Sequence, residues 1–286
     1  MKYAFIQKES IHHAINSLCR ALSVSRSGYY DWRDRAPSPR DIANQQLLGK
    51  IIDLHRVHQQ RYGSPRMHAA LRQQGQPVSK GRVERLMRQH QIVAQRAKRH
   101  RRVYIQRVQQ KAPSNILSRD FKAAAPNCKW VSDITFIATR EGFLYLAIVL
   151  DIFSRAIVGW AMSHRIDGDL VLEALNMAIE HRGSPQGVLV HSDQGSQYTA
   201  EAYRERLNHY AMVCSMSRKG ECHDNAVAES FFHTLKEELT HDKKYINRHE
   251  ARQSIFEYIE LYYNRQRLHS YLGYQAPLKY EKMHAA

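Results

Sequence analysis

The stretch Val188-Leu-Val-His-Ser-Asp193-Gln-Gly195 decides the fold of this 286-residue chain, together with Asp224-Asn-Ala-Val-Ala-Glu229-Ser-Phe-Phe232 further on. The first segment is typical of a short apolar strand that runs into an acid. The second is typical of the opening turns of a helix, which we expect to extend from Asn225 to Leu239. Between Asp193 and Glu229 lie 35 residues, enough for a helix and a strand. Both acids can therefore belong to one α/β domain.

A second acidic strand lies upstream. Trp130-Val-Ser-Asp133-Ile-Thr-Phe-Ile137 carries an acid at its centre, where aspartate is disfavoured. Strands and helices follow it in a pattern that indicates a mixed α/β sheet. The expected strands are Trp130–Ile137, Phe143–Leu150, Ala156–Met162, Val188–Asp193 and Met212–Met216, with a hairpin turn at Arg140-Glu-Gly142. The expected helices are Asp169–His181, Thr199–Tyr210 with Thr199 as its cap, Asn225–Leu239 and Arg248–Arg265.

Three acids on two strands and one helix suggest a metal site. Asp133 and Asp193 would lie on neighbouring strands, and in open α/β sheets ligand sites collect at the carboxyl ends of strands. Carboxylate oxygens suit Mg²⁺, and two ions about 3.5–4 Å apart can support an in-line phosphoryl displacement without a side-chain nucleophile. Glu229 alone would be read as a surface carboxylate. The combination of three acids favours the metal site.

The helix that carries Glu229 gives a further signal. Glu229, His233 and Lys236 fall on one face, at spacings i, i+4 and i+7. Lys236 would lie roughly 10 Å from Glu229 along the helix axis, where it could hold a DNA phosphate. The residues expected to face the core are Val227, Phe231 and Leu235.

The positive charge of the chain is concentrated in its N-terminal part. Residues 1–124 carry 25 Lys and Arg against 7 Asp and Glu, whereas residues 125–286 carry 18 against 20. A strongly basic segment joined to a near-neutral one indicates a module that binds nucleic acid, attached to a second module.

The first part of the basic segment predicts a short helix, a turn and a second helix within residues 12–34, the second capped by Ser25. As a helix-turn-helix it would present Arg26, Tyr29 and Arg33 outward to DNA. The alternative is an ordinary helical hairpin whose aromatic side chains pack internally. The sequence favours neither.

A stronger helix-turn-helix follows the linker at residues 36–43. Helical periodicity runs over residues 44–58, and a second helix begins near Ser64, which would cap it ahead of Pro65, and ends near residues 73–75. Ser79 can cap a third helix. The basic residues expected to contact DNA here are Arg66, Lys80, Arg82, Arg85 and Arg88.

Residues 95–124 are expected to form a basic linker, whose basic run could follow a phosphate backbone or a groove of DNA. The alternative is a solvated linker that only aids solubility. The candidate DNA contacts of the basic run are Arg96, Lys98, Arg99, Arg101 and Arg102. The expected domains are thus residues 1–40 (helix-turn-helix-like), 41–94 (second helix-turn-helix), 95–124 (basic linker), 125–240 (catalytic core) and 241–286 (C-terminal helical extension).

The sequence also excludes several classes of protein. No apolar run approaches the length that spans a membrane, because the run that begins at Phe143 stops at Asp151. The four cysteines are scattered without a C-x-x-C pair, so neither a disulfide framework nor a zinc site is expected. We expect a cytoplasmic protein, associated with the nucleoid when bound to DNA.

In combination these motifs resemble a known family. Trp130-Val-Ser-Asp133-Ile-Thr-Phe136, His191-Ser-Asp193-Gln-Gly-Ser-Gln-Tyr198 and Asp224–Phe232 with Lys236 are similar to the D,D(35)E core of the integrase superfamily. The nearest resemblance is to the OrfB subunit of IS-three family insertion-sequence transposases. Two further stretches share it: Arg61-Tyr-Gly-Ser-Pro-Arg66 and Tyr263-Asn-Arg-Gln-Arg-Leu-His-Ser-Tyr-Leu-Gly-Tyr274.

The resemblance implies an α/β fold: an RNase H-like mixed five-stranded sheet flanked by helices, preceded by all-α helix-turn-helix modules. It makes Asp133, Asp193 and Glu229 the catalytic ligands of two Mg²⁺ ions, with Mn²⁺ as a substitute. The substrates would be double-stranded DNA of terminal inverted repeats and of the target. Cleavage would free a 3′-OH that attacks another phosphodiester, joining the element's ends into a circle before insertion. Candidate DNA contacts in the core are Arg218, Lys219, Asn225 and Lys236.

Two features depart from the wider group. Active enzymes of this family usually fuse OrfB to an upstream OrfA with a leucine zipper, and no heptad zipper is evident here. The chain is therefore either OrfB alone, for which an OrfA-type partner or fusion is possible, or the product of an element that dispenses with the fusion. His12, His13 and Cys19 do not reproduce the zinc module of retroviral integrases, so we predict no structural zinc. A homodimer or higher oligomer on DNA is expected, because two ends must be brought together.

Two other functions stay open at this point. A DNA-binding accessory or regulator of another transposase would have a catalytically silent core. An RNase H-like nuclease would act on RNA–DNA hybrids, but helix-turn-helix modules favour B-form duplexes.

Overall fold

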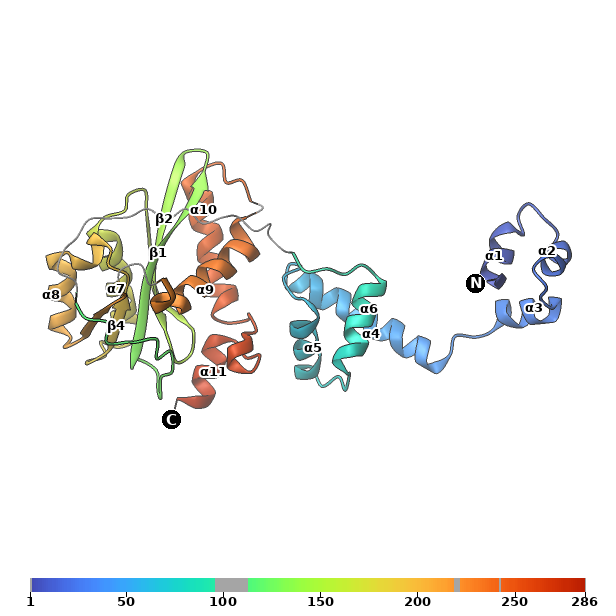
Figure 1. Ribbon diagram of the computed structural model, residues 1–286, viewed down its shortest axis with the longest axis horizontal. Coiled ribbons are helices and arrows are strands. Elements are labelled where there is room, and N and C mark those ends of the chain that lie inside the picture. Colours follow the sequence, from blue (N-terminus) through green and yellow to red (C-terminus); the bar gives the residue numbers. More distant parts are fainter. Residues whose placement is uncertain (1, 96–112, 219–221, 242, 286) are drawn as a thin grey trace.

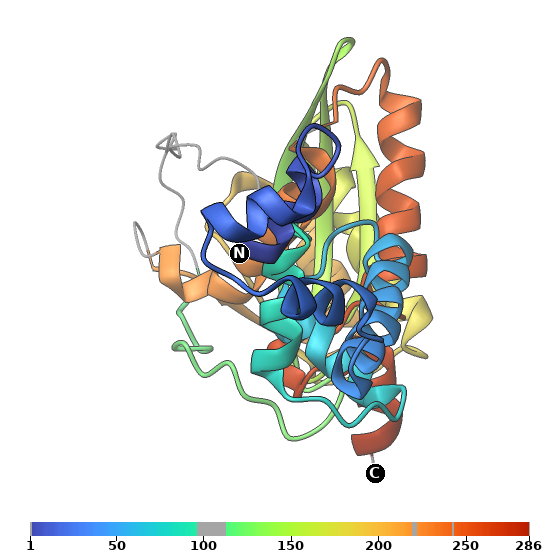
Figure 2. The same cartoon turned by 90° about the vertical axis from the view of Figure 1, so that its right-hand side faces the viewer.

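The computed structural model describes residues 2–95, 113–218, 222–241 and 243–285, so the expected DNA contacts from Arg96 to Arg102 and Lys219 lie outside the described residues. An α/β core and two helical units follow one another along the long axis of the molecule (Figure 1). Figure 2 looks along that axis, with the N-terminal helices nearest the viewer. No helix in the described residues is both long and apolar enough to cross a membrane.

The core is a five-stranded mixed sheet, as the sequence predicts, and its strand order is β3-β2-β1-β4-β5. Its strands are β1 Lys129–Thr139, β2 Gly142–Asp151, β3 Ile157–Ser163, β4 Leu189–Ser192 and β5 Val213–Met216. β1, β2 and β3 pair antiparallel, and the expected hairpin turn connects β1 to β2. β4 and β5 pair parallel to β1 and to each other. This arrangement is the RNase H-like topology that was expected.

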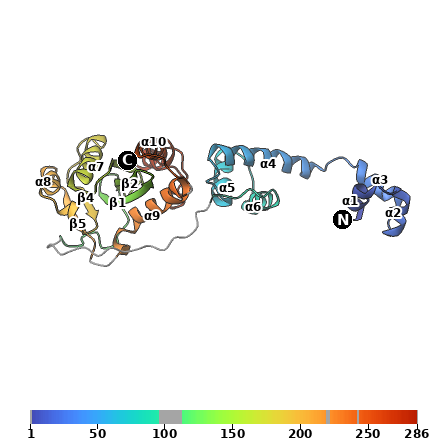
Figure 3. The same cartoon turned by 90° about the horizontal axis from the view of Figure 1, so that it is seen from above.

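Helices cover both faces of the sheet (Figure 3). α7, Gly168–His181, packs on one face with a cap from Asp167, and α8, Glu201–His209, lies beyond it near β5. α9, Ala226–Leu235, and α10, Arg248–Phe256, cover the other face. Both α9 and α10 continue into π-helical segments, Lys236–Thr240 and Glu257–Tyr263. π-helical turns often mark functional positions in helices.

Some local expectations for the core were wrong. Thr199 does not cap α8, because the chain makes a 3₁₀ turn over Ser196–Thr199 and the N-cap is Ala200. The sequence analysis also missed α11, Pro277–His284, which begins with proline in its first turn. Proline is well suited to that position because its missing N–H has no partner there in any helix.

The middle helical unit comprises α4, Pro39–Val57, α5, Ser64–Gln73, and α6, Lys80–Gln89. α4 starts earlier than expected: Ser38 caps it and Pro39 opens it, so most of the expected linker at residues 36–43 is helical. Ser64 is not a cap, since it already lies inside α5 and Gly63 precedes the helix. Ser79 caps α6 as predicted, accepting from the Arg82 amide.

This unit packs directly onto the α/β core. Its buried side chains, among them Ile51 and Met67, form one continuous hydrophobic cluster with those of α9 and α10. The Tyr62 hydroxyl donates to the carbonyl of Gln266 at 3.2 Å and accepts from the Leu268 amide at 3.0 Å. The α4–α6 unit is therefore held in a defined position on the α/β core.

The first unit is built differently. Three helices, α1 Lys2–Glu9, α2 Ile15–Ala21 and α3 Arg26–Asp34, enclose a small cluster of their own around Ile6, Cys19 and Tyr29. Tyr29 is 1% exposed and its ring packs near those of Tyr3 and Trp32. The expectation that Tyr29 faces outward was wrong. The internally packed alternative is what forms, completed by α1, which the sequence analysis missed.

Candidate active site

The two strand acids lie side by side. In the parallel β1–β4 pair, Val131 is opposite His191, and two residues further along each strand come Asp133 and Asp193. Asp193 directly follows the last residue of β4 and is exposed, whereas Asp133 is half-buried. The parallel register thus brings both carboxylates to the same level at the carboxyl edge of β4, where ligand sites of α/β sheets collect.

The backbone fixes each of these carboxylates locally. Asp133 Oδ1 accepts a hydrogen bond from the Ile134 amide at 2.8 Å, and Asp193 Oδ1 accepts from the Gly195 amide at 2.9 Å. A Cβ atom at Gly195 would stand 2.9 Å from that same Asp193 oxygen. The glycine of the Asp-Gln-Gly motif therefore leaves room for the acid and donates to it.

Glu229 comes from α9 on the other side of the edge. Val227, Phe231 and Leu235 are buried against the core, as the sequence predicts. This packing orients the helix and leaves Glu229 half-exposed one turn from its start. Asp133 lies within electrostatic reach of Asp193, Glu229 and Lys236. Both other predicted acids thus lie within electrostatic range of Asp133.

The environment raises the pKa of the Asp133 carboxyl well above its usual value. Loss of hydration is the largest cause, followed by repulsion from the neighbouring Asp193 and, more weakly, from Glu229. Within the described ranges, no group of three or more His, Cys, Asp or Glu side chains converges closely enough to enclose a metal ion. Asp133 is therefore repelled by two acids that do not form a closed cage with it.

Lys236 stands beside this group. Its positive charge lowers the pKa of Asp133, and its Nζ lies 5.0 Å from the ring centroid of Phe136 on β1. His233 of the same helix points outward and lies 3.3 Å from Glu237. Lys236, the first residue of the π-helical segment that continues α9, therefore shares the carboxylate edge.

Asn225 does not face the solvent as a DNA contact would. It is 5% exposed, and its side-chain amide donates to the Ser132 carbonyl at 3.1 Å. Ser132 in turn donates to Ile148 and lies 3.1 Å from the Tyr198 hydroxyl. The expected DNA contact at Asn225 was wrong: this residue ties the start of α9 to the strand that carries Asp133.

Asp224 is a structural acid that the sequence analysis did not assign a role. Its side chain is fully buried, and Arg218 and Arg119 form ion pairs with it at 3.2 and 2.7 Å. Burial alone would raise the pKa of Asp224, but the hydrogen bonds from these two arginines outweigh it and hold the pKa far below the usual value. Arg218, expected to contact DNA, here anchors the loop before α9.

Glu238 was also missed, although it joins the α4–α6 unit to the core. Arg267 pairs with it at 2.8 Å and Arg66 at 3.0 Å, and Tyr258 donates to it at 2.9 Å. Arg61 donates to the main-chain carbonyl of the same residue. Arg66, expected to contact DNA, is thus engaged at this junction. The signal in the sequence is the presence of two arginines in each of the segments 61–66 and 265–267, since arginines that become buried need an acid as partner.

The basic residues of α6 differ in how exposed their side chains are. Lys80 and Arg88 are exposed and Arg85 is half-buried, whereas Arg82 donates to Asn44 at 2.9 Å. In the first unit Arg26 and Arg33 are exposed, and Arg33 pairs with Asp34.

Three family models match the chain. A model described as an integrase core domain matches residues 123–222, and a second model with that description matches residues 229–284. An HTH-like domain model matches residues 43–100, which include α4 to α6.

Curated relatives match the whole chain. The transposase InsF for insertion sequence IS3A of Escherichia coli strain K12 is 40% identical over 288 residues, covering 100% of both chains. An uncharacterized 31 kDa protein of insertion element IS600 from Shigella sonnei is 39% identical over 268 residues, covering 93% of this chain and 98% of the relative.

Among solved structures, the HTLV-2 integrase catalytic core domain in complex with magnesium is 19% identical, with a TM-score of 0.33 over 39% of this chain and 68% of that one. The simian T-cell lymphotropic virus intasome is 12% identical, with a TM-score of 0.45 over 81% of this chain and 74% of that one.

Proposed function

This chain belongs to the IS-three family of insertion-sequence transposases, and we propose that Asp133, Asp193 and Glu229 are the carboxylates with which it cleaves and joins DNA strands. The chain is a polynucleotidyl transferase with an integrase core and a DNA-binding HTH-like domain. The observation that carries the proposal is the meeting of the three acids: Asp133 is repelled by both others although they come from separate elements.

The donor set fits a divalent cation. Its members supply only carboxylate oxygens, the ligands that Mg²⁺ prefers, and their mutual repulsion is relieved by a cation between them. Asp133, Asp193 and Glu229 would hold two Mg²⁺ ions, for which Mn²⁺ can substitute. Such ions supply activation of the attacking oxygen and charge neutralisation at the leaving oxygen.

The other side chains position the DNA. Lys236 holds a non-bridging oxygen of the scissile phosphate next to Glu229, and Asn225 keeps α9 in register with β1. Water attacks the phosphorus in line, and the bond to the 3′ oxygen breaks, which leaves a 3′-OH. That hydroxyl then attacks the phosphorus of a second phosphodiester. Its oxygen forms the new bond and the acceptor strand's 3′ oxygen leaves, so the joined strand has an ordinary 3′–5′ linkage.

Recognition of the terminal inverted repeats falls to α6. Lys80, Arg85 and Arg88 project from its surface, as the second helix of a helix-turn-helix does toward the major groove. The first unit offers Arg26 and Arg33 as backbone contacts. Two ends must be held together for joining, so the active form on DNA is a dimer or higher oligomer, with an OrfA-type partner or fusion as a further component.

Strand transfer on a labelled duplex that carries the element's end tests this function. With Mg²⁺ present, the wild type and Glu237→Gln should nick and join the duplex, whereas Glu229→Gln should bind it and remain inert. Glu237 is a suitable control because it lies in the same helical region but pairs outward with His233. If chemistry needs an added OrfA-type protein, the comparison is repeated with it. Equal activity of Glu229→Gln and wild type would refute the carboxylate assignment.

A further inference from the structure

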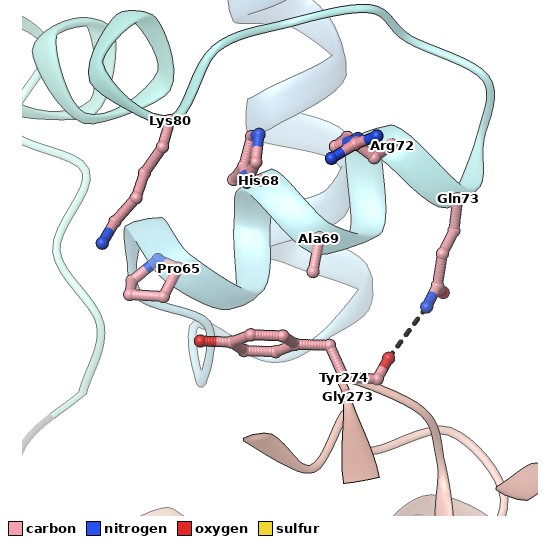
Figure 4. Close-up of a pocket in the computed structure, with 8 residues that line it drawn as sticks. All are labelled: Pro65, His68, Ala69, Arg72, Gln73, Lys80, Gly273 and Tyr274. Atoms are coloured by element: carbon pink, nitrogen blue, oxygen red, sulfur yellow. Dashed lines mark hydrogen bonds between the residues drawn. The ribbon is translucent and has the colours of Figure 1, made fainter. Parts of the chain in front are cut away.

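A hollow lies away from the three acids, where α5, the start of α6 and the Gly273–Tyr274 turn meet (Figure 4). Its volume is about 480 Å³, a size at which pockets enclose ligands as large as a nucleotide. Its walls belong to two parts of the molecule: the α4–α6 unit supplies Arg72 and Lys80, and the C-terminal extension supplies Tyr274. Any ligand held here would contact both parts at once.

The strongly charged side chains at this hollow are cations. Arg72 and Lys80 are both exposed, and no acid is among the described residues that line it. Neither side chain forms a salt bridge within the part of the chain that the structure describes. Arg66, one and a half turns before Arg72 on α5, instead pairs with Glu238. The helix therefore directs one arginine to the core and offers the other to an anion.

Tyr274 is held in a backbone conformation that bulky residues rarely adopt. Its φ is +61°, in the left-handed region. Two hydrogen bonds fix it there: Gln73 Nε2 donates to the Tyr274 carbonyl at 2.8 Å, and the Tyr274 amide donates to the His269 carbonyl at 2.9 Å. Figure 4 shows its ring along the hollow, below Pro65 and Ala69. Backbone strain of this kind persists where the position of a side chain matters for function.

We propose that this hollow binds one nucleotide unit of the DNA strand that α6 recognises, an inference that rests on the proposed function. Arg72 and Lys80, at opposite ends of the hollow, hold the phosphates on either side of this unit, and the ring of Tyr274 packs against its sugar or base. Arginine, lysine and tyrosine are common backbone contacts in protein–DNA complexes. Since Lys80 is the first residue of α6, a strand that runs along α6 passes the hollow. The contact would fix the orientation of the DNA end relative to the catalytic core.

The salt dependence of DNA binding distinguishes the phosphate contact of Arg72 from the ring contact of Tyr274. The full chain is titrated with a terminal-repeat duplex at several salt concentrations. Arg72→Gln removes one phosphate contact, so the slope of log Kobs against log salt should become shallower by about 0.9. Tyr274→Asn keeps a residue that tolerates the left-handed backbone but removes the ring. Its affinity should fall by at least about 5-fold with the slope unchanged.

Lys279→Gln is the matched control, since it removes one exposed charge from α11, outside the hollow, and should leave both slope and affinity unchanged. A scan of single methylphosphonates then identifies the phosphate. At one position the uncharged linkage should weaken the wild type several-fold and leave Arg72→Gln unaffected, because the two changes remove the same contact.

An unchanged slope for Arg72→Gln, or strict additivity at every methylphosphonate, would overturn the proposal while wild-type cleavage still upholds the proposed function. A free nucleotide is the other source of this chemistry. Binding of adenosine monophosphate that is sensitive to Arg72→Gln, together with an unchanged DNA slope, would also overturn it. If the wild type neither binds nor cleaves terminal repeats, the proposed function fails, and this inference with it.

Discussion

Two sets of acids in this molecule have pKa values shifted in opposite directions. Glu238 and Asp224 are buried among arginines, whereas Asp133 lies beside two further acids. Burial favours the protonated form of all three. Arg267 and its neighbours nevertheless lower the pKa of Glu238, and Arg218 and its neighbour lower that of Asp224. At Asp133 the adjacent carboxylates add to the effect of burial, and its pKa rises.

The difference separates structural acids from functional ones. A buried acid with matched arginines is satisfied by the protein itself and fixes the relative position of two segments. At Asp133 the Ile134 amide and Lys236 only partly offset burial and the repulsion of the neighbouring acids, so a further positive charge would stabilise the carboxylate. Groups with strongly perturbed pKa values cluster at functional sites for this reason.

The largest effect is expected at Asp133. Asp133→Asn should lower strand cleavage and transfer on the order of 10³-fold or more, because a bound cation supplies several kcal/mol of transition-state stabilisation. The same change removes repulsion with Asp193 and Glu229, so Tm should stay level or rise. Calorimetry and a strand-transfer assay measure the two effects.

A Mg²⁺ titration controls this prediction. The ion should raise the Tm of the wild type, because it binds the native state, and should raise that of Asp133→Asn far less. A marked fall in the variant's Tm without metal would show that the fold depends on this acid, contrary to the comparison.

Glu238 should behave in the reverse manner. Glu238→Gln leaves Arg267, only 4% exposed at its side chain, without a counter-charge. Breaking a buried pair in this way costs about 3–5 kcal/mol, which urea unfolding would measure. Glu237→Gln, whose side chain is 39% exposed, should change stability by less than about 0.5 kcal/mol. Similar losses of unfolding free energy in the two variants would show that Glu238 does not stabilise the fold.

A smaller loss is expected at Asp224. Its arginine partners, Arg119 and Arg218, are 42% and 60% exposed, so water screens them once the acid is neutral. Asp224→Asn should therefore reduce the free energy of unfolding by about 1–3 kcal/mol. Because the loop before α9 loosens, strand cleavage should fall several-fold, but Arg119→Gln should reproduce only part of both effects. A variant with wild-type stability would argue that Asp224 is not an anchor.

The sequence could predict the core because its signals are local and periodic. The strand patterns gave the sheet, and an aspartate at the centre of an apolar strand marked Asp133. Spacing then linked Asp193 to Glu229. These features follow from the alternation of a strand and the face of a helix, which are read from neighbouring residues.

The missed features depend on contacts between distant parts of the chain. Glu238 pairs with Arg66, which lies 172 residues earlier in the chain. No local sequence pattern predicts an ion pair between residues so far apart. The inward orientation of Tyr29 depends on α1, whose Tyr3 packs near it. Without an expected helix at residues 2–9, the sequence could not decide which way Tyr29 faces. Caps are decided by small backbone differences, so Ser64 and Thr199 were plausible and wrong, although Ser79 was right.

The smallest effect expected is a difference in how stability varies with pH. The pKa of Glu238 is lowered in the folded state, so its contribution is fully present above the ordinary glutamate value of about 4.3 and is lost as pH falls toward the lower folded value. The pKa of Asp133 is raised, so the folded state retains a proton that the unfolded state releases. Its contribution therefore declines as pH rises above the ordinary aspartate value of about 3.9.

Each of these groups changes the slope by at most about 1.4 kcal/mol per pH unit. Denaturant titrations from pH 3 to pH 8 should show that Glu238→Gln flattens the acid limb relative to wild type, whereas Asp133→Asn flattens the decline above about pH 4. Because the two variants act on opposite limbs, a general loss of charge cannot mimic the pattern. If both flattened the same limb, the two acids would belong to one class, and the contrast between arginine-matched and unmatched carboxylates would no longer distinguish the scaffold from the site.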